Sequence, residues 1–203
     1  MRYDQRFHLR RSIRLKGYDY SSPGAYFVTL VTMDRLNLFG EVVGDMMKLS
    51  LCGEIAQKVW GQLPHRFLNI TLDFSVIMPN HFHGIIVINE AIGRGGSSAS
   101  HQAADKFDLV DQSVTDNLLK TRPYNGQVSR PYKGKRYALS ELIRSLKSDS
   151  ARRINNIRGT TGCAVWQRNY YERIVRNQRE LDALRAYIID NPRHWMEDKE
   201  YKV

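Results

Sequence analysis

The sequence predicts an α+β fold, in which an antiparallel or mixed sheet carries helices mostly on one face. Two observations lead to this class: apolar runs rich in β-branched and aromatic residues, and segments with a helical apolar repeat. Their order along the chain is strand, strand, helix, strand, strand, loop, helix, strand, helix, which is typical of strands that pair with their neighbours. A chain of 203 residues is long enough for one domain with a hydrophobic core.

The first half of the chain contains four expected strands and one expected helix. The strands are expected at residues 25–33, 38–43, 70–78 and 81–89. A turn at Pro79 and Asn80 separates the last two strands. Residues 49–64 place an apolar side chain at every fourth position, which indicates a helix that Pro64 helps to end.

The second half begins with a segment that lacks periodicity and continues with two expected helices. Residues 90–137 start with a Gly/Ser-rich run and stay polar, so we expect an insertion or mobile loop. A basic helix follows, with Ser140 as its expected N-cap. Residues 165–177 are expected to form a short strand and a turn, after which Asn177 caps the last helix.

These elements predict a single domain with a flank at each end. We expect a basic N-terminal arm at residues 1–24, a domain at 25–192 that contains the insertion, and a C-terminal tail at 193–203. The chain has no apolar run long enough to cross a bilayer and no apolar leader at its charged N-terminus. Its two cysteines lack metal-site spacing, which favours a reduced, cytoplasmic setting.

Positive charge gathers in two blocks of the sequence. The net charge is +10, and Lys120–Arg176 holds 14 Lys/Arg against 3 Asp/Glu. Residues 1–16 hold 6 basic side chains against 1 acidic. Two basic blocks with aromatic residues between the charges favour a nucleic-acid partner, although a merely soluble basic surface is the alternative.

Two histidines stand at the start of the fourth expected strand, in MPNHFHGIIVIN (residues 78–89). Alternation along a strand places His81 and His83 on one face, with their Cα atoms roughly 6.6 Å apart, and Phe82 on the other. Two imidazoles at this spacing can share a divalent ion and leave its other positions to another residue and to substrate oxygens. The alternative is a pair of histidines that bond only to the backbone.

The last expected helix carries a second candidate pair. Tyr187 and Asn191 are four residues apart in YIIDNP, so they share a helix face. The tyrosine is a candidate covalent nucleophile and the amide oxygen a candidate third metal ligand. The alternatives are that Tyr187 is a packing residue and that Asn191 only ends the helix. No P-loop motif and no carboxylate cluster of a two-metal nuclease occurs in the sequence.

Three motifs together resemble the HUH single-tyrosine transposases: MPNHFH at 78–83, VWQRNYYERIVRN at 165–177 and YIIDNP at 187–192. The sequence is most similar to the REP-associated tyrosine transposases and their insertion-sequence relatives. The resemblance extends from about Gly24 to Pro192, with the 90–137 segment as an interruption.

The resemblance implies a ferredoxin-like core with a central antiparallel sheet. It also implies that His81, His83 and Asn191 bind Mg²⁺ or Mn²⁺, and that Tyr187 attacks DNA. The expected reaction is cleavage of single-stranded, hairpin-containing DNA through a 5′-phosphotyrosine intermediate, followed by rejoining. The active unit is expected to be a monomer, or a homodimer with a shared site.

The basic blocks and their aromatic residues supply the expected DNA contacts, with cations on phosphates and rings on unpaired bases. The predicted DNA-binding residues are Arg10, Arg11, Arg14, Arg144, Lys147, Arg152, Arg153, Trp166, Arg168, Tyr170, Tyr171 and Arg173. Core packing is the alternative for Trp166.

Two other functions remain open from the sequence. The first is a catalytically silent hairpin-binding protein or repressor derived from a transposase, which binds DNA in a salt-dependent way without cleaving it. The second is a relaxase or replication initiator with the same chemistry, for which 203 residues leave little room.

Overall fold

The computed structural model describes residues 15–90 and 135–198. Most of the predicted insertion lies outside these described residues, as does most of the predicted arm. Three predicted DNA-binding residues also lie outside them: Arg10, Arg11 and Arg14.

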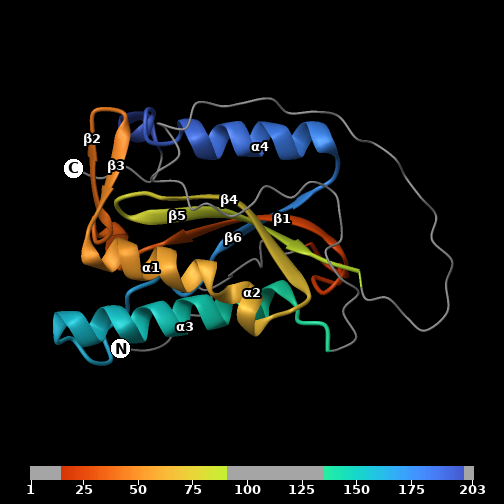
Figure 1. The fold of residues 1–203 in the computed structure, drawn as a ribbon, viewed down its shortest axis with the longest axis horizontal. Coiled ribbons are helices and arrows are strands. Elements are labelled where there is room, and N and C mark those ends of the chain that lie inside the picture. The colour runs from red at the N-terminus through yellow and green to blue at the C-terminus, as the bar shows by residue number, and fades with distance from the viewer. Residues whose placement is uncertain (1–14, 91–134, 199–203) are drawn as a thin grey trace, which may run out of the picture.

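A four-stranded antiparallel sheet forms the centre of the molecule (Figure 1). Its strands in spatial order are β4 (Ile70–Ile77), β5 (His81–Ile88), β1 (Gly24–Val31) and β6 (Tyr171–Val175). The helices are α1 (Leu51–Gly61), α2 (Leu63–Arg66), α3 (Leu139–Arg158) and α4 (Gln178–Asp190). The connection β1–α1–β4–β5–α3–β6 with this strand order is the ferredoxin-like arrangement, which confirms the predicted fold class.

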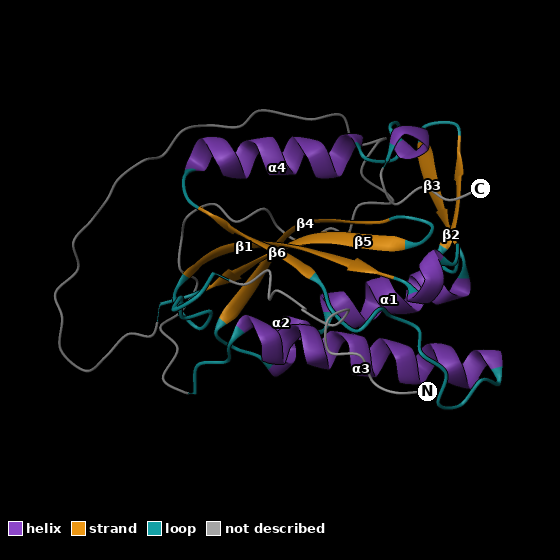
Figure 2. Ribbon diagram, turned by 180° about the vertical axis from the view of Figure 1, so that it is seen from behind, coloured by secondary structure: helices purple, strands orange, loops and turns teal. Residues whose placement is uncertain are grey.

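The two faces of the sheet are covered differently. Helices α1, α2 and α3 lie on one face, and α4 lies alone on the other (Figures 1 and 2). The larger apolar cluster contains Tyr26, Leu30 and Phe82 and faces the three helices. The smaller cluster contains Ile85 and Ile188 and lies under α4. Both faces of β5 are therefore buried, which explains why HFHGIIVI is almost continuously apolar.

Helices α1 and α4 begin at polar caps, whereas α3 begins in a different way. The Ser50 hydroxyl accepts from the Gly53 amide at the start of α1, and Asn177 caps α4 as predicted. Ser140 was expected to cap α3, but this prediction is wrong because α3 begins one residue after Ala138. There the carboxylate of Glu141 accepts a hydrogen bond from the Ala138 amide, so an acidic side chain supplies the cap.

A β-hairpin precedes the first helix, and its first strand is the strand predicted at residues 38–43. Strand β2 (Gly40–Val43) pairs with β3 (Met46–Leu49) across a two-residue Gly44–Asp45 turn. The φ angle of Gly44 is +60°, a value that glycine adopts without strain. The sequence pattern missed β3 because its four residues, MMKL, do not alternate cleanly between apolar and polar.

The segment after α4 is not a detached tail in its described part. A 3₁₀ turn at Trp195–Glu197 buries the Trp195 ring in the smaller cluster with Met78 and Ile188. Residues 193–198 therefore add to the packing on the α4 side of the sheet, beyond the predicted domain boundary at residue 192.

Gly84 lets an aromatic ring lie directly on β5. A Cβ atom added at Gly84 would lie 2.8 Å from two ring carbons of Trp60 in α1. The Trp60 ring is fully buried and packs at 4.7 Å, centroid to centroid, against Phe82. Side chains larger than hydrogen would push α1 away from the strand that carries the two histidines.

We expect Gly84→Ala to lower the free energy of unfolding by about 1–3 kcal/mol, because the new methyl group overpacks the core. Denaturant unfolding at constant metal and pH measures this change. The loss should shrink in a Trp60→Phe background, where the ring is smaller and the unpartnered Trp60 indole nitrogen is removed. Equal losses in both backgrounds would contradict the assigned contact.

Candidate metal and tyrosine site

Strand β5 holds the two histidines side by side on the α4 face. The register pairs His81 with Val31 and His83 with Thr29 of β1, so both imidazoles stand in the row of side chains beneath α4. Their exposed fractions are 0% and 2%, and their ring centroids are 4.6 Å apart. The alternation of strand side chains has therefore placed the rings as the sequence predicted.

Each imidazole is oriented through its Nδ1 atom. Nδ1 of His81 is 3.0 Å from Oδ1 of Asn80, an amide oxygen that can only accept, so Nδ1 carries the proton. The lone pair of His81 then lies on Nε2, which suits a metal ligand. Nδ1 of His83 is 2.8 Å from the Thr29 hydroxyl, which orients the second ring. Sequence reasoning missed Asn80 and Thr29 as orienting residues, although Asn80 stands next to His81 in the chain.

Helix α4 brings Tyr187 to the histidine pair. The Tyr187 hydroxyl is 3.3 Å from Nε2 of His83, although the two residues are 104 positions apart in the sequence. The Phe27 ring stacks on His83 at 5.3 Å and meets Tyr187 edge-on at 6.1 Å, which steadies both rings. Tyr187 remains 42% exposed, so its hydroxyl is open to a ligand from solvent.

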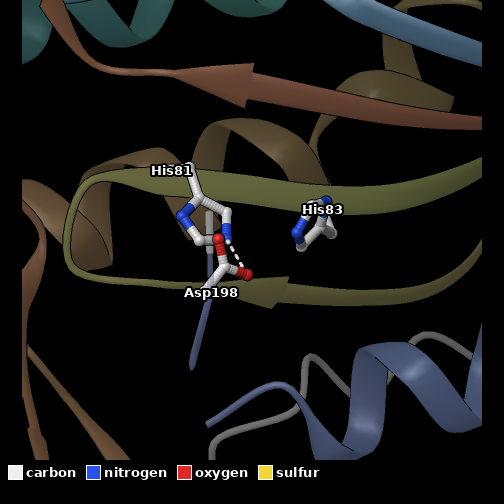
Figure 3. Close-up of side chains that lie close together, drawn as sticks. All are labelled: His81, His83 and Asp198. Atoms are coloured by element: carbon white, nitrogen blue, oxygen red, sulfur yellow. Dashed lines mark ion pairs between the residues drawn. The ribbon is translucent and has the colours of Figure 1, made fainter. Parts of the chain in front are cut away.

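Asp198 is a further candidate ligand that the sequence reasoning missed. Its carboxylate is 4.0 Å from Nε2 of His81 and is almost entirely buried (Figure 3). The Trp195 ring lies 5.8 Å from the His81 ring and holds the turn that carries Asp198. One donor atom each from His81, His83 and Asp198 lie within 4.8 Å of one another. Asp198 belongs to no motif of the sequence, so only the packing of Trp195 reveals it.

Asn191, the predicted third ligand, follows one helical turn after Tyr187 at the end of α4. Its side chain is buried, with an exposed fraction of 3%. Its Oδ1 atom has no hydrogen-bond partner among the described residues. A buried amide oxygen without a partner costs free energy unless a donor or a cation satisfies it.

The donor set fits a divalent cation. With its proton on Nδ1, His81 presents a lone pair toward a carboxylate, an arrangement that a cation between them stabilises. Imidazole, carboxylate and amide oxygen together match the ligands of Mn²⁺ and, less closely, of Mg²⁺. His81, His83 and Asp198 can therefore hold a metal ion. The Oδ1 atom of Asn191 is a further candidate oxygen ligand.

The basic helix lies on the far side of the sheet from this site. Helix α3 and α4 cover opposite faces (Figure 2), so Arg144, Arg152 and Arg153 belong to the layer opposite Tyr187. Arg144 and Arg152 are exposed, and Arg152 forms a 2.7 Å ion pair with Asp149. A DNA strand that touches both α3 and the histidines must therefore pass around an edge of the sheet.

Trp166 lies in the core rather than on a binding surface. Its exposed fraction is 7%, its ring packs at 4.9 Å against Phe39, and its indole donates to the Ser150 hydroxyl at 2.8 Å. The prediction that Trp166 stacks on a base is therefore wrong, and the core-packing alternative describes it. Arg168, two residues further on, is exposed.

Lys147 also serves its own chain. Its ammonium group donates to the carbonyl oxygens of Gln167 and Asn169, both at 2.8 Å, and stands 5.5 Å from the centroid of the Tyr170 ring. Burial lowers the pKa of the Lys147 ammonium group to about 8. Lys147 thus fixes the segment before β6 to α3.

Tyr171 and Arg173 are the predicted DNA contacts on the same side of the sheet as the histidines. Tyr171 is opposite Thr29 in the register, so alternation places it on the face beneath α4. It is 56% exposed. Arg173 is exposed too, and its guanidinium forms a 2.6 Å ion pair with Glu180.

Comparison with known proteins finds three similarities. Residues 133–191 match the family model described as IS200-like transposase. The chain is 34% identical to an uncharacterized protein of Haemophilus influenzae, in an alignment that covers 98% of this chain and 97% of that one. The chain is also similar to a solved structure of a REP-associated tyrosine transposase bound to a REP hairpin, at 14% identity and a TM-score of 0.49. The alignment covers 89% of this chain and 73% of the chain in that structure.

The chain is similar to the IS200-like transposase family over residues 133–191. In the part of the chain that the structure describes, no helix is both long and apolar enough to span a membrane.

The lowered pKa of Lys147 predicts a pH-dependent contribution to stability. Between pH 8 and 10.5 the unfolded chain retains a proton on Lys147 that the folded chain loses, so stability rises with pH in this window. The difference in free energy of unfolding between wild type and Lys147→Met should therefore increase, in favour of wild type, by on the order of 1 kcal/mol between pH 8 and 10.5. Chemical unfolding at several pH values measures the difference, and a pH-independent gap would contradict the burial of a charged amine.

Proposed function

We propose that this protein is a metal-dependent enzyme that cleaves and rejoins single-stranded DNA through a covalent bond to Tyr187. The observation that carries the proposal is the 3.3 Å contact between the Tyr187 hydroxyl and Nε2 of His83, beside His81 and Asp198. A nucleophile and a candidate metal site thus come together from the last helix and a central strand. The substrate proposed is DNA with a hairpin near the cleavage point, which the family resemblance implies.

His81, His83 and Asp198 would hold the divalent ion, with Asn191 as an additional oxygen ligand. Bound there, the metal would polarise the scissile phosphate and stabilise the negative charge that develops in the transition state. Asn80 and Thr29 keep the two imidazoles in the orientation that this binding requires.

Tyr187 would perform the transfer itself. Its phenolic oxygen forms a bond to phosphorus while the bond between phosphorus and the 3′ oxygen breaks. The phenol loses one proton and the released 3′ oxygen gains one, so protons balance and a 5′-phosphotyrosine remains. The ester retains the bond energy, and attack by a 3′-hydroxyl reverses the step without a nucleotide cofactor.

The single strand would reach Tyr187 along the exposed part of the same face. Tyr171 offers an exposed ring on that face, and stacking on one base is worth roughly 1–3 kcal/mol. Arg173 and Arg168 supply exposed positive charge on β6 and just before it. The cations of α3 would contact a second part of the DNA, such as a hairpin stem, on the other side of the sheet.

Tyr187→Phe should abolish covalent adduct formation, because only the phenolic oxygen can form the phosphate ester. The measurement uses end-labelled single-stranded DNA from the protein's own genomic flanks with Mg²⁺ or Mn²⁺, and detects a protease-sensitive labelled band. A chelator should abolish the wild-type band too. Tyr137→Phe, on the α3 side of the sheet, is the matched control and should keep it.

Persistence of the adduct in Tyr187→Phe would discard the assignment of the nucleophile. Absence of any adduct from wild type, together with salt-dependent DNA binding that His81→Ala and His83→Ala leave unchanged, would favour the catalytically silent binding protein.

Asp198→Asn should weaken Mn²⁺ binding at least tenfold, because it removes the only negative charge of the proposed ligand set. Titration calorimetry on the DNA-free protein measures this directly, without reference to cleavage. Glu197→Gln is the matched control, since that neighbouring carboxylate is exposed and pairs with His194. Equal Mn²⁺ affinity for Asp198→Asn and wild type would remove Asp198 from the site.

A further inference from the structure

A fully buried carboxylate lies beneath the tyrosine helix, outside the metal site. Asp73 in β4 has an exposed fraction of 0%. The pairing of β4 with β5 shifts register between Leu72 and Ser75, so Asp73 sits in a β-bulge. Its Oδ1 atom accepts from the Phe74 amide at 2.9 Å. A bulge can change the direction of a side chain, and here the Asp73 carboxylate in the bulge contacts α4.

Arg185 of α4 binds this carboxylate with two nitrogen atoms. Nε and Nη2 donate to Oδ2 of Asp73 at 3.0 and 2.7 Å, across 112 residues of sequence. The guanidinium also stands 5.6 Å from the centroid of the Phe74 ring. With Asp73 fully buried and the Arg185 side chain 17% exposed, the two charges interact where water screens them little.

The pair is placed where it can fix the rotation of α4 about its axis. At 100° per residue, Arg185 and Tyr187 lie on opposite flanks of the buried stripe that Leu181 and Ile188 form. If the phenolic oxygen is roughly 8 Å from the helix axis, a rotation of roughly 7° moves it by about 1 Å. A displacement of this size can cost about 100-fold in a reaction rate.

We propose that the Asp73–Arg185 ion pair is a positioning device that holds Tyr187 at the metal site within its own chain. This inference rests on the proposed function, since it treats Tyr187 as the nucleophile. Arg185 and Tyr187 are both carried by α4, so the pair can act on the tyrosine through the helix. Apolar packing alone gives α4 two buried side chains, which fix its distance from the sheet more strongly than its rotation.

A double variant can separate positioning from stability. Replacing both members of a buried ion pair by apolar residues is often neutral or stabilising, whereas removing one member leaves a buried charge alone. We therefore expect Asp73→Leu/Arg185→Met to fold and to bind the single-stranded DNA with unchanged affinity. Its rate of adduct formation at saturating DNA should fall about 10- to 100-fold.

The matched control is Asp182→Asn. Asp182 is an exposed second partner of Arg185, at 3.2 Å on the same helix. Its loss leaves the Asp73 contact intact, so the adduct rate should stay at the wild-type value.

Amide hydrogen exchange gives a second readout that does not depend on DNA cleavage. The double variant should speed exchange in α4 near Ile188, while exchange in α3 stays unchanged. A wild-type adduct rate and wild-type α4 exchange in the double variant would overturn the positioning role. If wild type itself forms no adduct, the proposed function fails, and the exchange result alone decides whether the pair holds α4.

Discussion

The contact between the Tyr187 hydroxyl and the His83 imidazole is the constraint on which the proposed chemistry depends. It joins the last helix to a central strand, and each side has its own support. The strand is buried on both faces, so it cannot shift without disturbing two apolar clusters. Among the α-helices of the described residues, α4 alone lies on its face of the sheet, so its orientation depends on the contacts beneath it (Figure 1).

Burial gives the polar groups of this site their strength. His81, His83 and Asn191 are each at most 3% exposed, so water cannot satisfy them and the protein must. Asn80 and Thr29 bond the Nδ1 atoms, which leaves the Nε2 side of the rings for a cation and for the nucleophile. The same low solvent access makes a bound cation more effective on a phosphate than it would be in water.

The sequence predicted those parts of the site that follow from local periodicity. Alternation along HFH placed the two imidazoles together, and the four-residue spacing of Tyr187 and Asn191 placed them on one helix face. Apolar patterning also predicted the strands of the sheet, whereas the ferredoxin-like core was implied by the family resemblance. Asp198 could not be predicted, because its place depends on how Trp195 packs after the helix has ended. Trp166 shows the same limit, because an aromatic residue between basic residues suits a binding surface and a core equally well.

The separation of the basic helix from the tyrosine constrains how any DNA must bind. A flat strand on the α4 face reaches Tyr171 and Tyr187 but leaves the α3 cations unused, because the sheet and its two apolar layers lie between. A folded nucleic acid can use both surfaces, with its stem against α3 and its single strand continuing around an edge of the sheet. The β6 edge suits this path, because β6 carries Tyr171 and Arg173 and lies at one side of the strand order. Under the proposed function, the charge on the two faces of the described residues favours a substrate with both paired and unpaired parts over a simple single strand.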